Sequence, residues 1–265
     1  MLSNGHTAAG DGTITFDQSR ALRGGITPGD TAGFPVTISQ SGSYRLTGNL
    51  VVPDLDTTAI QITADFVTLD LNGFSIAGPG VCTTSPTTVC PAPGTGVGIQ
   101  ATGSQAPFPR GIRVVNGSVH GMGLLGIQLN GLGSSVERVT VDSNAGGGMG
   151  VQGAVIQSAA TQNGNFGILA MSIRDSIARQ NAGDGIILGI DGGIAIGNVS
   201  SENGGIGLAV QLGTATGNTA FLNHDAGIAA ICPSTVVGNT VVTNGSSSIE
   251  THNDGCTVAN NGTRP

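Results

Sequence analysis

The chain of 265 residues holds 46 glycines and carries a net charge of −7, yet its mean hydropathy is positive. Disordered glycine-rich chains are polar, so this composition excludes them, and the irregular spacing of glycine excludes collagen. The absence of lysine and the negative charge exclude a P-loop, a Schiff-base lysine and binding to nucleic acid through a basic surface. No run of 18 apolar residues occurs, so the sequence predicts no membrane span.

Residues 1–35 are predicted to form an N-terminal segment that caps the rest of the chain. Residues 1–12 lack the apolar core of a signal peptide. Asp17 is placed to cap a short helix that continues to Arg23 and ends at the Gly24-Gly25 pair. A repeat protein needs such a cap because its first coil otherwise exposes a strand edge.

Short predicted strands follow, separated by Gly, Pro, Asn and Asp. They cover residues 36–38, 44–46, 50–52, 60–62, 67–71 and 112–117. Between the last two, residues 77–110 are rich in Pro, Thr and Gly, and we predict that they form a loop insertion.

The second half of the chain repeats about every twenty residues, and asparagine marks the repeat. The marking asparagines are Asn144, Asn163, Asn181, Asn203, Asn223 and Asn244. The fifth residue after each asparagine is apolar, with Ile168, Ile186, Leu208 and Ile228 among them. The seventh residue is mostly apolar as well, and this period of two is typical of a strand with one buried face.

These features predict an all-β fold: a single right-handed parallel β-helix over residues 36–265. A left-handed β-helix keeps coil lengths near multiples of six, which the steps between these asparagines break. Stacked coils would join the asparagine amides into a hydrogen-bonded ladder at one corner. Glycine and asparagine are expected to supply the positive φ of the corners. The coil of residues 163–181 is expected to slip in register most easily, because Arg174 falls on a nominally inward position.

Four cysteines allow three disulfide connectivities, of which local pairing is the simplest. That pairing joins Cys82 to Cys90 and Cys232 to Cys256. An even number of cysteines in a chain with few charges indicates an oxidising compartment, so we expect an extracellular, cell-surface or periplasmic protein. The alternative is four buried free thiols.

Several stretches resemble bacterial secreted proteins with a pectin-lyase-like right-handed β-helix. They are the SGSYRLTGN sequence at 41–49, the ADFVTLDLNGF sequence at 64–74, and the repeats with Gly-Asn and Asn-x-x-x-Gly-Ile. The resemblance covers about residues 36–262. It implies the fold, but the superfamily includes polysaccharide lyases, glycoside hydrolases, uronan epimerases, adhesins and proteins without known activity, so function depends on a site.

The candidate catalytic residues are scattered, because no acidic cluster of the kind that the resemblance implies for lyases and hydrolases is evident. They are Asp142, Arg179, Glu202, His224 and Asp225. Asp142 and Arg179 share a repeat position two coils apart, with Thr161 between them, and Glu202 is placed to pair with Arg179. His224 next to Asp225 is a general-base candidate, although adjacent residues on a turn usually point apart. We expect no metal and no other cofactor, because no histidine has a His or Cys partner at ligand spacing.

An apolar stripe is expected on the outside of the coils. The interface candidates are Leu169, Met171, Ile187, Ala209, Ala229 and Ile231. Such a surface usually marks a partner, so a homo-oligomer is predicted unless the insertion covers this face.

The first hypothesis for function is therefore an extracellular, non-catalytic β-helix for surface binding or assembly, with a polysaccharide as a further possible partner. The alternative is a carbohydrate-active enzyme, a lyase, hydrolase or epimerase acting on acidic polysaccharide. A third reading, ice binding through Thr140, Thr219 and Thr240, is weakened by Ala159, Ile177 and Val199, which interrupt the row.

Overall fold

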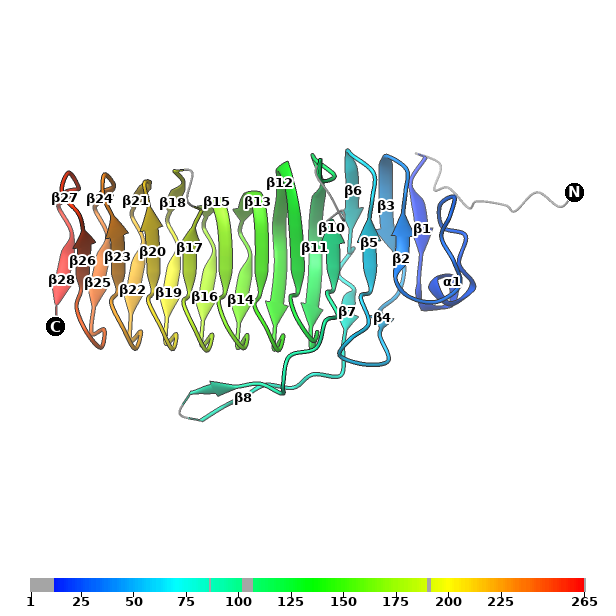
Figure 1. Ribbon diagram of the computed structural model, residues 1–265, viewed down its shortest axis with the longest axis horizontal. Helices are drawn as coiled ribbons and strands as arrows, with labels where there is room; N and C mark the ends of the chain where they lie inside the picture. The colour runs from blue at the N-terminus through cyan, green and yellow to red at the C-terminus, as the bar shows by residue number, and fades with distance from the viewer. Residues whose placement is uncertain (1–11, 86, 102–106, 190–191, 265) are drawn as a thin grey trace, which may run out of the picture.

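The computed structural model describes residues 12–85, 87–101, 107–189 and 192–264. The chain forms a right-handed parallel β-helix of about ten coils, as the repeat predicted (Figure 1). The coils stack along one long axis, with the single helix of the described residues at the N-terminal end and the last strands at the other (Figure 1). Most coils contribute one short strand to each of three rows, and each row is a stack of parallel strands.

The first row runs the length of the solenoid. It contains β2 (Val36–Ile38), β5 (Ile60–Ile62), β10 (Ile99–Ala101), the starts of β12 (Ile127–Asp142), β13 (Met149–Ile156) and β15 (Ile168–Arg174), then β17 (Ile186–Leu188), β20 (Leu208–Gln211), β23 (Ile228–Ile231) and β26 (Ile249–His252).

The second row follows on the next face of each coil. It contains β1 (Ile14–Phe16), β3 (Gly42–Leu46), β6 (Val67–Asp70), the start of β11 (Arg113–His120), later parts of β12, β13 and β15, then β18 (Ile194–Ile196), β21 (Thr214–Thr216), β24 (Thr235–Val237) and β27 (Thr257–Ala259).

The third row ends at the asparagine corner. It contains β4 (Leu50–Val51), β7 (Ser75–Ala77), the ends of β11 and β12, then β14 (Ala159–Thr161), β16 (Ile177–Arg179), β19 (Val199–Ser201), β22 (Thr219–Phe221), β25 (Thr240–Val242) and β28 (Gly262–Arg264).

The core is a thin column of aliphatic side chains, one layer for each coil. Ile168, Ile186, Leu208 and Ile228 are in register on successive strands of the first row, and each is at most 1% exposed. This confirms the column that the repeat predicted. Arg174, by contrast, is exposed and paired in register with Ile196, so the expected inward arginine is wrong. The register of its strand β15 against β13 does shift, between Val151 and Ala154, within the coil where a slip was expected.

The asparagine ladder is present at the corner between the third row and the next first row. Asn181 shows the pattern: its side-chain nitrogen donates to Asn203 Oδ1 at 2.9 Å, and its own Oδ1 accepts from Asn163. A second ladder of Asn198, Asn218, Asn239 and Asn261 joins the second row to the third. Stacked amides therefore hold two of the three corners.

Glycine supplies the positive φ at only one of these two corners. Gly197, Gly217 and Gly238 precede asparagines of the second ladder with φ between 66° and 70°. At the first ladder the same role falls to residues with side chains, such as Gln180 with φ 54° and Leu222 with φ 55°. The expectation that Gly and Asn supply every corner is therefore wrong at the first ladder.

The N-terminal end begins with the predicted helix. Helix α1 (Gln18–Arg23) is capped by Asp17, whose side chain accepts a hydrogen bond from the Arg20 backbone nitrogen at 2.9 Å. Strand β1 pairs in parallel with β3, so the solenoid gains a strand ahead of residue 36. The domain boundaries at residues 35 and 36 stay a prediction.

Within residues 77–110 a disulfide-bonded hairpin leaves the solenoid. Strands β8 (Thr83–Thr84) and β9 (Thr88–Val89) pair antiparallel, and the Cys82–Cys90 disulfide closes them. The hairpin lies along the outside of later coils (Figure 1). Strand β10 then returns to the first row, so only part of this range stands apart from the coils.

A second disulfide joins Cys232 to Cys256 and holds the last coil to the one before it. Both pairs follow the predicted local connectivity, and no cysteine is free. Two disulfides fit an oxidising environment.

Candidate functional site

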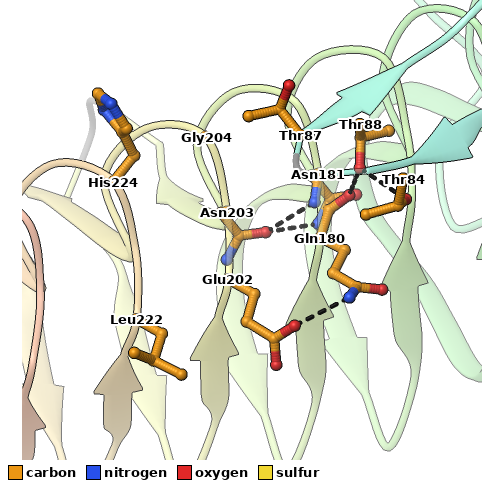
Figure 2. Close-up of a pocket in the computed structure, with 10 residues that line it drawn as sticks. All are labelled: Thr84, Thr87, Thr88, Gln180, Asn181, Glu202, Asn203, Gly204, Leu222 and His224. Carbon is orange, nitrogen blue, oxygen red and sulfur yellow. Dashed lines mark hydrogen bonds between the residues drawn. The ribbon is translucent and has the colours of Figure 1, made fainter.

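A pocket of about 270 Å³ lies beside the tip of the hairpin, at the asparagine corner of the solenoid. The hairpin forms one wall and successive coils form the floor (Figure 2). The lining residues are Thr84, Thr87, Thr88, Gln180, Asn181, Glu202, Asn203, Gly204, Leu222 and His224. Two of the five catalytic candidates, Glu202 and His224, are therefore brought into one cavity.

Contacts with three consecutive coils fix the hairpin wall. Gln162 Nε2 donates to Thr84 Oγ1 at 3.2 Å, and the Thr88 hydroxyl donates to the Gln180 carbonyl. Cys90 Sγ lies 3.8 Å from the Asn144 carbonyl oxygen, so the disulfide itself rests on the corner. The threonine hydroxyls of the hairpin consequently face the coils from a fixed position.

The floor of the pocket is a row of side chains at the residue before each ladder asparagine. Gln180, Glu202 and Leu222 hold this position on successive coils, each with φ between 54° and 56° (Figure 2). The left-handed backbone turns the chain at the corner, and the asparagine that follows is buried in the ladder. The three side chains thus form one line along the axis of the solenoid.

Both oxygens of Glu202 are held by donors from the coil before it. Gln180 Nε2 donates to Oε2 at 2.8 Å, and Arg179 Nη2 lies 2.8 Å from Oε1. The side chains of Arg179 and Glu202 are 52% and 29% exposed, so the pair is open to water and a ligand can reach it. This arrangement orients the carboxylate and holds the guanidinium at the edge of the pocket, and it matches the predicted pairing.

His224 and Asp225 meet in a way that the sequence argued against. His224 Nδ1 lies 3.2 Å from Asp225 Oδ1, although adjacent residues on a turn were expected to point apart. The imidazole is 75% exposed, so its other nitrogen can be reached from solvent. Asp225 does not line the pocket itself and contacts His224, which does.

Asp142 lies apart from the other candidates. Its carboxylate accepts a hydrogen bond from Thr161 Oγ1 at 3.0 Å, and Thr161 separates it in register from Arg179, as predicted. Two coils span about 10 Å. Asp142 is not among the pocket residues, so the structure places two of the five candidates in the pocket and two more, Arg179 and Asp225, in contact with them. Their catalytic role stays a prediction.

Sequence reasoning missed six residues of the pocket: Gln180, Leu222, Gly204 and the three hairpin threonines. A signal for the first two existed, because both directly precede a ladder asparagine, as Glu202 does. No sequence signal showed which coils the hairpin would reach, because that depends on the path of the chain outside the repeat.

A second cavity, also of about 270 Å³, lies on the outer side of the first row. Leu169, Met171 and Ile187 line it together with Phe166 and several amide side chains. These three interface candidates are partly buried, whereas Ile231 is 39% exposed and Ala229 is 8% exposed. The hydrogen bonds of the hairpin go to the asparagine corner and not to these residues. A homo-oligomer through this face stays a prediction.

Within the described residues, no group of three or more His, Cys, Asp or Glu side chains could hold a metal ion. No helix in the part of the chain that the structure describes is long and apolar enough to cross a membrane.

Comparisons with known proteins place the fold. No protein-family model and no curated protein sequence matches the chain. Among solved structures, the A-module of mannuronan C-5 epimerase AlgE4 from Azotobacter vinelandii is similar, with TM-score 0.60, 16% identity, and coverage of 84% of this chain and 68% of that one. The A-module of mannuronan C-5 epimerase AlgE6 from the same organism has a TM-score of 0.59 and 17% identity, with coverage of 83% of this chain and 67% of that one. A point mutant of the periplasmic alginate epimerase AlgG has a TM-score of 0.52 and 12% identity, with coverage of 96% of this chain and 84% of that one.

At these identities the likeness establishes a shared parallel β-helix, as the resemblance to pectin-lyase-like proteins implied. It also corrects the first hypothesis for function. The similar solved structures are polysaccharide epimerases, which contradicts the hypothesis of a non-catalytic surface or assembly protein and favours the alternative of a carbohydrate-active enzyme.

Proposed function

We propose that this protein is an extracellular carbohydrate-active enzyme that removes a proton from a uronate unit of an acidic polysaccharide, as an epimerase or a lyase. The observation that carries the proposal is the pocket at the hairpin tip, which is lined by Glu202, the partner of Arg179, and by His224, the partner of Asp225. The polysaccharide epimerases among the similar folds support the same class of substrate. The two disulfides support the extracellular location.

His224 is the proposed base. When Nδ1 carries the proton of the neutral imidazole, it donates a hydrogen bond to Asp225 Oδ1, and Nε2 keeps a lone pair that can accept a proton from a substrate. An exposed imidazole that a carboxylate orients is a suitable general base near neutral pH. Its target is the hydrogen on C5, the carbon next to the uronate carboxylate.

Arg179 is the proposed partner of that carboxylate. It has five N–H donors, and the described contacts use only Nη2, toward Glu202. The remaining donors can bind a substrate carboxylate, and the positive charge stabilises the enolate that forms when the C5 proton leaves. Glu202 then acts by holding the guanidinium in position.

Hydrolysis fits the pocket less well. Glycoside hydrolases usually need two carboxyl groups, one on each side of the scissile bond. Glu202 is the single carboxylate among the pocket residues, and donors hold both of its oxygens. Proton abstraction needs only a base and a positive charge near the carboxylate, which the pocket provides.

The two proposed reactions share their first step and differ in the second. In an epimerase, a proton returns to C5 from the opposite side of the ring. In a lyase, the electron pair of the broken C–H bond forms a C4–C5 double bond, and the oxygen on C4 leaves with the rest of the chain and takes up a proton.

The test is a panel of mannuronan, alginate, polygalacturonate and a neutral glucan. Each is incubated with the protein in heavy water and monitored for unsaturated ends, reducing ends and deuterium at C5. Deuterium without chain cleavage indicates an epimerase, and unsaturated ends indicate a lyase. Reducing ends without unsaturation, or no change in any uronan, would contradict the proposal.

His224→Gln provides the first variant in this assay. Loss of the general base should lower the rate by about 100-fold or more. His252→Gln is the matched control, because His252 is also an exposed histidine beside an acid, with Nε2 4.0 Å from Glu250 Oε2, but lies on the last coil outside the pocket. Equal rates for the two variants would remove His224 from the mechanism.

A further inference from the structure

Leu222 has an unusual place in the pocket. Its φ is 55°, a left-handed conformation that costs free energy for any residue with a Cβ atom. Its side chain is also 52% exposed, so burial in the core offsets little of that cost. The equivalent residue on the neighbouring coils is polar: Gln162, Gln180, Glu202 and Thr243.

The fold itself does not need a leucine at such a corner. At the second asparagine ladder, Gly197, Gly217 and Gly238 adopt the same left-handed turn without strain. Leu222 therefore presents an apolar side chain at a position where glycine would serve the backbone better. The same left-handed φ occurs at corner residues outside the pocket, such as Gln157 and Leu212, so what distinguishes Leu222 is an exposed apolar side chain inside the pocket.

The surroundings of Leu222 indicate what it binds. The Glu202 carboxylate, the Gln180 amide and the threonine hydroxyls of the hairpin line the same pocket and offer hydrogen-bond partners (Figure 2). A sugar ring combines hydroxyl groups around its edge with an apolar face of C–H bonds. Sugar sites often use an aromatic ring for that face, but no Phe, Tyr or Trp is among the residues that line this pocket.

We propose that Leu222 is a specificity-determining residue that supports the C–H face of a uronate unit bound in the pocket. Leu222 and His224 lie two residues apart on one coil and line one pocket, with their side chains directed to opposite sides of the corner (Figure 2). The inference rests on the proposed function and deepens it, because it selects substrates by an apolar ring face as well as by a carboxylate.

The test compares two leucines with the same backbone conformation. Leu212 has φ 53° and is 48% exposed, but it lies at another corner and outside the pocket. Asparagine tolerates the left-handed region, so Leu222→Asn and Leu212→Asn should both fold. Leu222→Met keeps an apolar side chain in the same place.

The measurement is the dissociation constant for mannuronan oligosaccharides by calorimetry, with circular dichroism as a check of folding. We expect Leu222→Asn to bind at least tenfold more weakly than the wild type, with Leu212→Asn and Leu222→Met within about threefold. The inference is overturned if Leu222→Asn binds as tightly as the wild type, or if both asparagine variants lose the same affinity. Neither outcome bears on the proposed function, which the turnover assay on the polysaccharide panel tests separately. A wild type that binds no oligosaccharide overturns the proposed function and this inference together.

Discussion

Buried amide groups are tolerated in this core because each finds its partners along the ladder. Asn203 accepts hydrogen bonds from the backbone and side chain of Asn181 at 3.0 and 2.9 Å, and it donates to Asn223 at 2.9 Å. Each such bond contributes about 1 kcal/mol, whereas an unpaired buried group costs about 1–3 kcal/mol. Within the described residues, no buried side-chain nitrogen or oxygen lacks a partner. The ladder asparagines are therefore structural, and the pocket uses the residues that precede them.

Tyr44 offers a residue-scale prediction about pH. Burial raises the pKa of its phenol, which is 1% exposed and donates to the Gln40 carbonyl at 2.7 Å. The folded state therefore holds the proton more tightly than the unfolded state, whose pKa is about 10. The stabilisation is complete below that pH and is lost as the pH rises through the folded pKa.

The measurement is simple because the chain has one Tyr and no Trp. Phenolate absorbance then reports Tyr44 alone, and we expect its midpoint in the folded protein to lie above that in denaturant. Tyr44→Phe should remove this part of the alkaline loss of stability. Equal midpoints in the folded and denatured chain would show that burial does not govern the phenol.

At the scale of elements, the hairpin is the part of the site most open to change. Its disulfide closes it, and its attachment to the coils depends on contacts such as those of Thr84 with Gln162 and of Thr88 with Gln180. In Cys82→Ser/Cys90→Ser we expect faster amide exchange in residues 83–89 and weaker oligosaccharide binding, while the coils keep their β-rich circular dichroism. A disulfide typically contributes about 2–4 kcal/mol to the element that it closes.

Cys232→Ser/Cys256→Ser is the control for that variant. It removes the other disulfide, at the end of the solenoid, so exchange should rise in the last coil while oligosaccharide binding stays as in the wild type. If both double variants bind alike, the hairpin is not a wall of the site.

The sequence predicted the repeating coils, the capped N-terminal helix and the disulfides, and it missed two contacts that occur once. Asparagine spacing located the coils and the column of Ile168 and Ile186, because stacking places equivalent residues in register. Local pairing of the four cysteines predicted both disulfides. The contact between His224 and Asp225 was missed because it depends on side-chain rotation at one turn. The position of the hairpin was missed because no neighbouring coil repeats it.

At the scale of the whole molecule, each coil packs mainly on the coil before it and the coil after it, so stability is close to a sum over neighbouring coils. A change at the pocket consequently affects a few coils and leaves the rest of the solenoid folded. This separation makes the site variants interpretable, since loss of binding and loss of fold can be measured independently.

The outer side of the first row gives the last prediction, a homo-oligomer. Leu169, Met171 and Ile187 line a cavity on that face, away from the hairpin contacts. Burying a stripe of roughly 400 Å² would contribute on the order of 10 kcal/mol before the cost of association. Leu169→Asp/Ile187→Asp should then sediment as a monomer with unchanged circular dichroism. Ile177→Asp is the control, because Ile177 is 45% exposed on the third row and should leave assembly intact. A monomeric wild type would show that this face serves another purpose, such as contact with the polysaccharide along the coils.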